Sequence, residues 1–251
     1  MSDLSTIEIR QLFNAHQVVQ EMVLSYRGYT LAEHPYPERM KLASMDELFQ
    51  LVPPAALGHL ESFGEALETL FQNAQSTLRI KFLLSEPTEQ SIGYMLGLGS
   101  HTFENKLTTF TQGKTGYLTE TRAQTLLVVI LRPINVMLQT TLFRLQSVLN
   151  THIELFSVLE LQLNPFDHVF QSKQELATIE FLTREDIDPE TLPVELVCYK
   201  IIYQNDKKNK EGGSVTAKFL GARDGDVIKH IRQSQTLGQF GMRCVREITE
   251  I

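Results

Sequence analysis

Two short stretches of the chain place a carboxylate two residues before a lysine, an order found in some metal-dependent nucleases. They are Glu104-Asn105-Lys106 and Asp206-Lys207-Lys208. Metal-assisted cleavage needs several ligands that converge on one ion, and neither tripeptide lies clearly on a core strand beside a second acid. Two isolated matches in polar segments are what chance provides. We therefore expect no catalytic residue in the chain and no enzymatic activity.

Residues that could hold a metal or a cofactor are scattered. The seven histidines include no pair spaced four residues apart and no cluster with cysteine, so no zinc site is expected. His16 and His168 are predicted to lie on a helix face and in a loop. Gly97 and Gly99 form only a fragment of a dinucleotide-binding motif, because no strand directly precedes them and the third glycine is missing. The sequence thus predicts no metal and no cofactor.

Binding chemistry concentrates between Ser214 and Arg246. A short helical turn there ends at Gly221, and Asp224-Gly225 predicts a tight turn, because glycine reaches positive φ without cost and aspartate caps such bends. Residues 227–232 and 240–246 have the pattern of two strands joined by a loop with hydroxyls and a glycine, which predicts an antiparallel hairpin. Arginines and hydroxyls on such a stiff hairpin suit a specific polar contact with a partner.

The order of residues in this stretch resembles a known family. Gly221-x-x-x-Gly225-Asp226-Val227-Ile228-Lys229-x-Ile231-Arg232-x-Ser234-x-Thr236-x-Gly238, followed by Arg243, is similar to the C-terminal signature of the fifth subunit shared by eukaryotic nuclear RNA polymerases, a family with an archaeal counterpart. Pro165-Phe166-Asp167-His168-Val169, Glu175-Leu176 and Leu192-Pro193 match in the family's order. The resemblance implies a noncatalytic subunit of a DNA-directed RNA polymerase whose C-terminal domain docks on the largest subunit.

The predicted partner interface combines this pattern with the hairpin. It comprises Gly225, Asp226, Lys229, Arg232, Ser234, Thr236, Gly238 and Arg243. Arginine is enriched among the residues that dominate binding at interfaces, which favours the two arginines as its centre. The alternative is that these residues only stabilise the hairpin.

Composition bounds the class of protein. With 251 residues, 42% hydrophobic and 21% charged, the chain is predicted to be globular and long enough for two domains. A net charge of -7 argues against a surface that binds nucleic acid throughout, although a local basic patch is allowed. Only Cys198 and Cys244 occur and no signal-peptide pattern opens the chain, which fits a reducing nuclear or cytosolic compartment. No apolar run is long enough to span a membrane.

Helical periodicity dominates the start of the chain. Ser5-Thr6-Ile7-Glu8 is a capping box that begins a helix ending at Gly28. Arg27-Gly28-Tyr29 is similar to the end of the family's first helix. Residues 45–50 predict a short helix, and a further helix is expected from Pro53-Pro54 through Phe71. Its acidic face is expected to be solvated and carries Glu61, Glu65 and Glu68.

A sheet is expected next. Residues 78–84 alternate like a strand, and the apolar run 124–131 predicts a buried strand at the centre of a sheet, before an amphipathic helix over 134–149. The resemblance makes residues 1–156 a jaw domain of α/β class, in which the loop after the central strand faces downstream DNA. Arg132 and Pro133 hold that place and become possible DNA-proximal residues. Ile134-Asn135 replaces the hydroxyl and small residues that usually follow the proline.

Residues 157–251 are predicted to form a small mixed α+β assembly domain. A capping box at Ser172-Lys173-Gln174-Glu175 predicts a helix from Lys173 to about Leu182. From Glu195 to Gly213 the chain has more residues than the family usually has, including a strand-like run over 196–203 and a polar loop around Lys207. We call residues 195–213 the insertion.

Several departures from the family pattern indicate a divergent copy. They are the insertion, Gly213-Ser214 in place of an aspartate-proline, and the altered loop after Pro133. A subunit that must fit several polymerases should stay close to the common pattern, and the divergent copies of some protists resemble a form dedicated to RNA polymerase I. We therefore expect a polymerase I subunit in the nucleus, in the nucleolus. The alternatives are the ordinary subunit shared by RNA polymerases I, II and III, and a stand-alone adaptor that uses the same platform in another complex.

Overall fold

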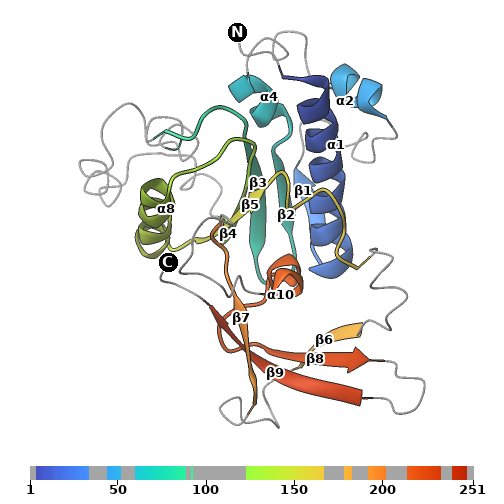
Figure 1. Cartoon of the computed structure of the whole chain (residues 1–251), viewed down its shortest axis with the longest axis vertical. Coiled ribbons are helices and arrows are strands. Elements are labelled where there is room, and N and C mark those ends of the chain that lie inside the picture. The colour runs from blue at the N-terminus through green and yellow to red at the C-terminus, as the bar shows by residue number, and fades with distance from the viewer. Residues whose placement is uncertain are drawn as a thin grey trace. The chain divides into compact units, whose positions relative to one another are not determined.

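The chain forms two compact units, Met1–Gln162 and Leu163–Ile251, each with its own sheet (Figure 1). The computed structural model describes residues 4–33, 44–51, 60–88, 92, 123–166, 178–182, 192–201, 214–232 and 239–247. Both units contain helices and strands, so the class is mixed α and β, and each sheet combines parallel and antiparallel pairs. The assignment of residues 1–156 to a jaw domain and of 157–251 to an assembly domain stays a prediction.

The sheet of the first unit has the order β1-β2-β3-β4-β5. Its strands are β1 (Thr30–Glu33), β2 (Thr69–Gln72), β3 (Thr77–Leu83), β4 (Thr125–Ile130) and β5 (His152–Ser157). The first three strands pair antiparallel, and β3, β4 and β5 pair parallel. All six residues of β4 are buried, which confirms the predicted central strand. A parallel strand covered on both faces has such a continuous apolar sequence.

Three predicted helices of the first unit are present, with small differences in their bounds. In α1 (Thr6–Glu21), Ser5 and Glu8 form the capping box, and the helix continues as a π-helix, η1 (Met22–Tyr26), up to Gly28 at φ 66°. The predicted short helix is α2 (Met45–Leu51). In α8 (Val136–Leu149), Asn135 is the N-cap, because its side chain accepts a hydrogen bond from the backbone N–H of Leu138. Helices α1 and α8 lie on either side of the strands in Figure 1.

The prediction of a helix from Pro53 through Phe71 is wrong for the last residues of that range. The structure describes its later part as α4 (Leu60–Ala66), and the chain then enters β2. The Asn73 side chain accepts hydrogen bonds from the backbone N–H groups of Gln75 and Ser76, which turns the chain so that β2 pairs with β3. Strand pairing therefore overrides the helical spacing of Leu70 and Phe71.

The sheet of the second unit has the order β6-β8-β9-β7. Its strands are β6 (Thr178–Leu182), β7 (Val194–Val197), β8 (Val227–Arg232) and β9 (Gln239–Glu247). Strands β8 and β9 pair antiparallel, which confirms the hairpin, and β7 joins β9 in parallel. The short helix α10 (Val215–Leu220) ends at Gly221, whose φ of 72° lies in the left-handed region that favours glycine.

Two predictions in the second unit need correction. Residues 178–182, expected to end a helix, form β6, which pairs antiparallel with β8. The expected helix start at Lys173 lies outside the described residues. The strand-like run over 196–203 is a strand only up to Val197. In both places the conformation depends on pairing with another strand, and the sequence of one segment does not identify that strand.

Candidate partner-binding site

The turn that begins the predicted interface is closed by its own backbone and by one carboxylate. Gly225 has φ 82°, in the region that favours glycine. Its N–H donates to the carbonyl of Val245 at 2.9 Å, and the N–H of Val245 donates to the carbonyl of Asp226 at 2.8 Å. The carboxylate of Asp226 accepts the N–H of Arg223 at 2.7 Å. Gly225 and Asp226 therefore shape the turn, and the Asp226 side chain already has a partner within it.

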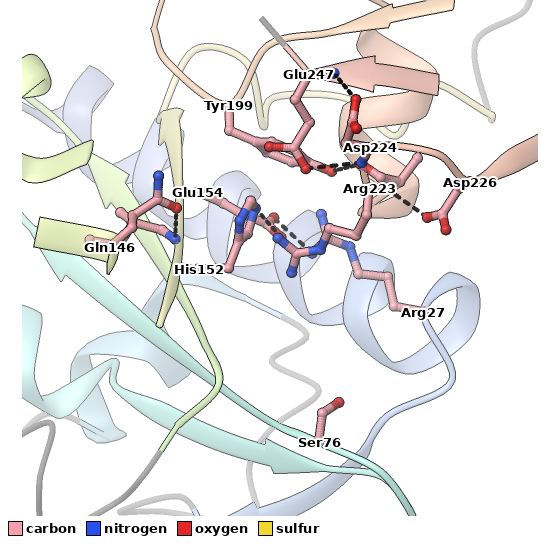
Figure 2. Close-up of polar contacts among 12 residues, drawn as sticks. Arg27, Ser76, Gln146, His152, Glu154, Tyr199, Arg223, Asp224, Asp226 and Glu247 are labelled. Carbon is pink, nitrogen blue, oxygen red and sulfur yellow. Dashed lines mark hydrogen bonds and ion pairs between the residues drawn. The ribbon is translucent and has the colours of Figure 1, made fainter. Parts of the chain in front are cut away.

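A second carboxylate contact joins this turn to the end of β9. The N–H of Asp224 donates to Glu247 Oε1 at 3.2 Å, and the N–H of Glu247 donates to Asp224 Oδ1 at 3.3 Å (Figure 2). The pair is reciprocal, so each residue satisfies a backbone donor of the other. Glu247 was not among the predicted site residues, because nothing in its spacing indicates that β9 ends beside the turn.

The register of the hairpin divides the predicted interface between two faces of the sheet. Arg243 pairs with Ile228, and Met242 pairs with Lys229. Successive residues of a strand belong to opposite faces, so Lys229 and Arg243 do not share one. Arg232, which pairs with Gln239, belongs by register to the face of Arg243. Arg243 is exposed, Lys229 is half-buried, and Ile228 opposite Arg243 is buried, so exposure favours Arg243 itself, and not the whole face, as a contact residue.

The remaining interface residues lie in the connection between β8 and β9. Ser234, Thr236 and Gly238 fall outside the described residues. Arg232 is placed by its backbone pairing in β8. Their role in binding stays a prediction.

The possible DNA-proximal residues follow β4. An Nη1 atom of Arg132 forms an ion pair with Oε1 of Glu8, in the capping box of α1, and Pro133 is exposed. The pKa of Glu8 lies below its usual range, chiefly because the carboxylate accepts the backbone N–H of Ser5, with Arg132 contributing. The guanidinium of Arg132 therefore already has an anionic partner, and a DNA phosphate would compete with Glu8 for it.

The prediction of a solvated acidic face for Glu61, Glu65 and Glu68 is wrong for Glu68. This residue precedes β2 and forms ion pairs with Arg79 and Lys81 of β3, the latter with 2.9 Å between Lys81 Nζ and Glu68 Oε2. The three side chains are only 11–12% exposed. Burial raises the pKa of Glu68 and lowers the pKa of Lys81, because the charged forms lose solvation. Glu65 is exposed, as expected.

Residues that could catalyse a reaction or bind a metal remain sparse. Among the described residues, no group of three or more His, Cys, Asp and Glu side chains could hold a metal ion. Both carboxylate-x-lysine tripeptides and His168 lie outside those residues. His16 lies on the buried face of α1, where its Nε2 contacts Gln20 Nε2 at 2.9 Å and its ring lies 6.0 Å from that of Phe82, which confirms the helix-face prediction.

Searches for relatives leave the family open. No protein-family model matches the chain, and no curated protein matches it. Within the part of the chain that the structure describes, no helix is long and apolar enough to cross a membrane. The resemblance to the polymerase subunit therefore depends on the ordered residues between Gly221 and Arg243 and on the shorter matches before them.

Proposed function

We propose that the chain is a noncatalytic subunit of a DNA-directed RNA polymerase, that it docks on the largest subunit and that it acts in transcription in the nucleus. One observation carries the proposal, the ordered pattern from Gly221 to Gly238 with Arg243 beyond it. This pattern is long, so it is more specific than a short motif. No cofactor belongs to this function.

The form of the hairpin supports a docking role. The described part of the pattern, residues 221–232 with Arg243, lies at the end of α10, in a hydrogen-bonded turn and on two paired strands, which are stiff elements. Binding to a rigid surface loses less conformational entropy than binding to a mobile loop. The exposed guanidinium of Arg243 can form a charge-assisted, bidentate hydrogen bond with a carboxylate of the partner.

The departures from the family pattern favour RNA polymerase I and thus the nucleolus and rRNA transcription. The insertion and Gly213-Ser214 directly precede α10, which leads into the predicted interface. In this proposal the first unit is the jaw near downstream DNA. Because Arg132 is paired with Glu8, the exposed Pro133 is the better candidate for proximity to DNA.

Affinity purification of a tagged full-length chain tests the proposal. We expect the two largest polymerase I subunits to be recovered, and the largest subunits of polymerases II and III to be nearly absent. Comparable recovery of the polymerase II or III subunit would show the ordinary shared subunit. Recovery of unrelated proteins alone would support the adaptor and overturn the polymerase assignment.

A further inference from the structure

The insertion begins inside the second unit. Its first residues continue β7, which pairs in parallel with β9 from Val194 and Cys244 to Val197 and Glu247. The N–H of Ser214, directly after the insertion, donates to the carbonyl of Leu196 at 2.7 Å, so the two ends of the insertion lie together. Among its described residues, those from Val197 to Ile201 are all buried. This part of the insertion therefore acts within the unit.

Tyr199 connects the insertion to the turn of the predicted interface. Its side chain is buried, at 2% exposed, and its hydroxyl donates to the carbonyl of Ala222 at 2.5 Å. The guanidinium carbon of Arg223 lies 5.7 Å from the centre of the Tyr199 ring, within the range of a cation–π contact (Figure 2). We call these two contacts the Tyr199 brace.

The Tyr199 brace contacts Ala222 and Arg223 at the start of the turn, and Asp226 lies at its end. Ala222 is also tied to α10, because its N–H donates to the carbonyl of Ala217 at 3.0 Å. The N–H of Arg223 donates to the Asp226 carboxylate, across the residues that carry the positive φ of Gly225. Residues 222–226 are thus held from the insertion, α10 and β9 together. Without the Tyr199 hydroxyl, the buried carbonyl of Ala222 would lose this hydrogen bond. The loss would favour another conformation of the turn.

We propose that Tyr199 is a positioning residue of the predicted partner interface, and that through it the first residues of the insertion, 195–201, raise the affinity for the largest polymerase subunit. The inference rests on the proposed function. It gives the insertion a defined task, because the family pattern usually has only a few residues at this place. Tyr199 holds Ala222 and Arg223, and through them the turn presents Gly225, Asp226 and the first residues of β8.

The test compares two tyrosine-to-phenylalanine variants of the full-length chain. Tyr199→Phe removes the hydroxyl and keeps the ring beneath Arg223. Tyr29→Phe is the matched control, since it removes a hydroxyl that contacts Ser76 Oγ at 2.8 Å in the first unit. Each variant is titrated against polymerase I purified without this subunit, and amide hydrogen exchange is followed at residues 222–226. For Tyr199→Phe we expect affinity to fall about three- to tenfold, as losing one hydrogen bond allows, and exchange in the turn to accelerate.

The outcomes separate the two proposals. Wild-type affinity for Tyr199→Phe, or an equal loss for Tyr29→Phe, would overturn the positioning role and leave the polymerase assignment intact. A loss that only follows the unfolded fraction, measured by circular dichroism in the same samples, would overturn it as well. If the wild-type chain binds no polymerase, the proposed function fails, and the inference fails with it.

Discussion

At the scale of single residues, the buried ion pair between Arg27, just after η1, and Glu154 of β5 explains why an arginine ends the first helical segment. Arg27 Nη1 lies 2.8 Å from Glu154 Oε2, and these side chains are 4% and 0% exposed (Figure 2). His152 Nε2 lies 3.7 Å from the other carboxylate oxygen. A charge without water costs several kcal/mol unless a partner of opposite charge balances it. Arg27-Gly28-Tyr29 is therefore a structural element of the first unit, whatever the chain binds.

Removing one member of this pair should destabilise the chain strongly. We expect Arg27→Met to lower the free energy of unfolding by about 3–5 kcal/mol, because Glu154 stays buried without its main counter-charge. Arg27→Met combined with Glu154→Gln should recover part of the loss, since no buried carboxylate remains. Urea unfolding of the wild type, both single variants and the double variant gives the coupling energy. A loss below about 1 kcal/mol in Arg27→Met would show that Glu154 does not need Arg27 as its main counter-charge.

At the scale of elements, the sequence predicted those whose signals are local. The capping box of α1, the apolar run of β4, the amphipathic pattern of α8 and the turn before β8 depend on residues close in sequence, and the structure confirms these four elements. Strands β2 and β6 were missed because their conformations depend on pairing with β3 and β8. The ion pairs of Glu68 with Arg79 and Lys81 and the Tyr199 brace were also missed, since their partners are distant in sequence. Such contacts leave no spacing signal in a single chain.

The capping box gives α1 a defined dependence on pH. The folded-state pKa of Glu8 is lowered, so its stabilising contribution is complete above the unfolded pKa of about 4.3 and is lost as the pH falls through the lower folded value. Glu8→Gln keeps the hydrogen-bonding shape of the box without the charge. We expect it to cost about 0.5–1 kcal/mol at pH 7 and almost nothing near pH 2.

Thermal unfolding of wild type and Glu8→Gln across this pH range measures the difference. Ser5→Ala is the companion variant, because it removes the cap at every pH and should cost about 1 kcal/mol throughout. An equal cost of Glu8→Gln at both ends of the range would mean that the Glu8 charge contributes nothing to the cap.

At the scale of the whole molecule, the two units offer different chemistry. The first unit has a mixed sheet whose exposed Pro133 follows the central strand, and its nearby Arg132 is neutralised by Glu8. The second unit has the exposed Arg243 on β9, and its turn before β8 is held by contacts from Tyr199, α10 and β9. Assembly with a protein partner is therefore expected to depend on the second unit, and any contact with DNA on the first.

This division predicts that arginine variants in the two units differ in their effect on co-purification of the largest polymerase subunit. Arg232→Ala with Arg243→Ala should reduce co-purification of the largest polymerase subunit at least about tenfold, because arginines at interface centres often contribute about 2 kcal/mol or more. Arg132→Gln should leave that recovery unchanged, since its guanidinium contacts Glu8 within the first unit. Unfolding curves of the same proteins show whether the double variant remains folded. If it assembles normally while the second unit loses stability, the arginines only hold the hairpin together, and the partner binds another surface.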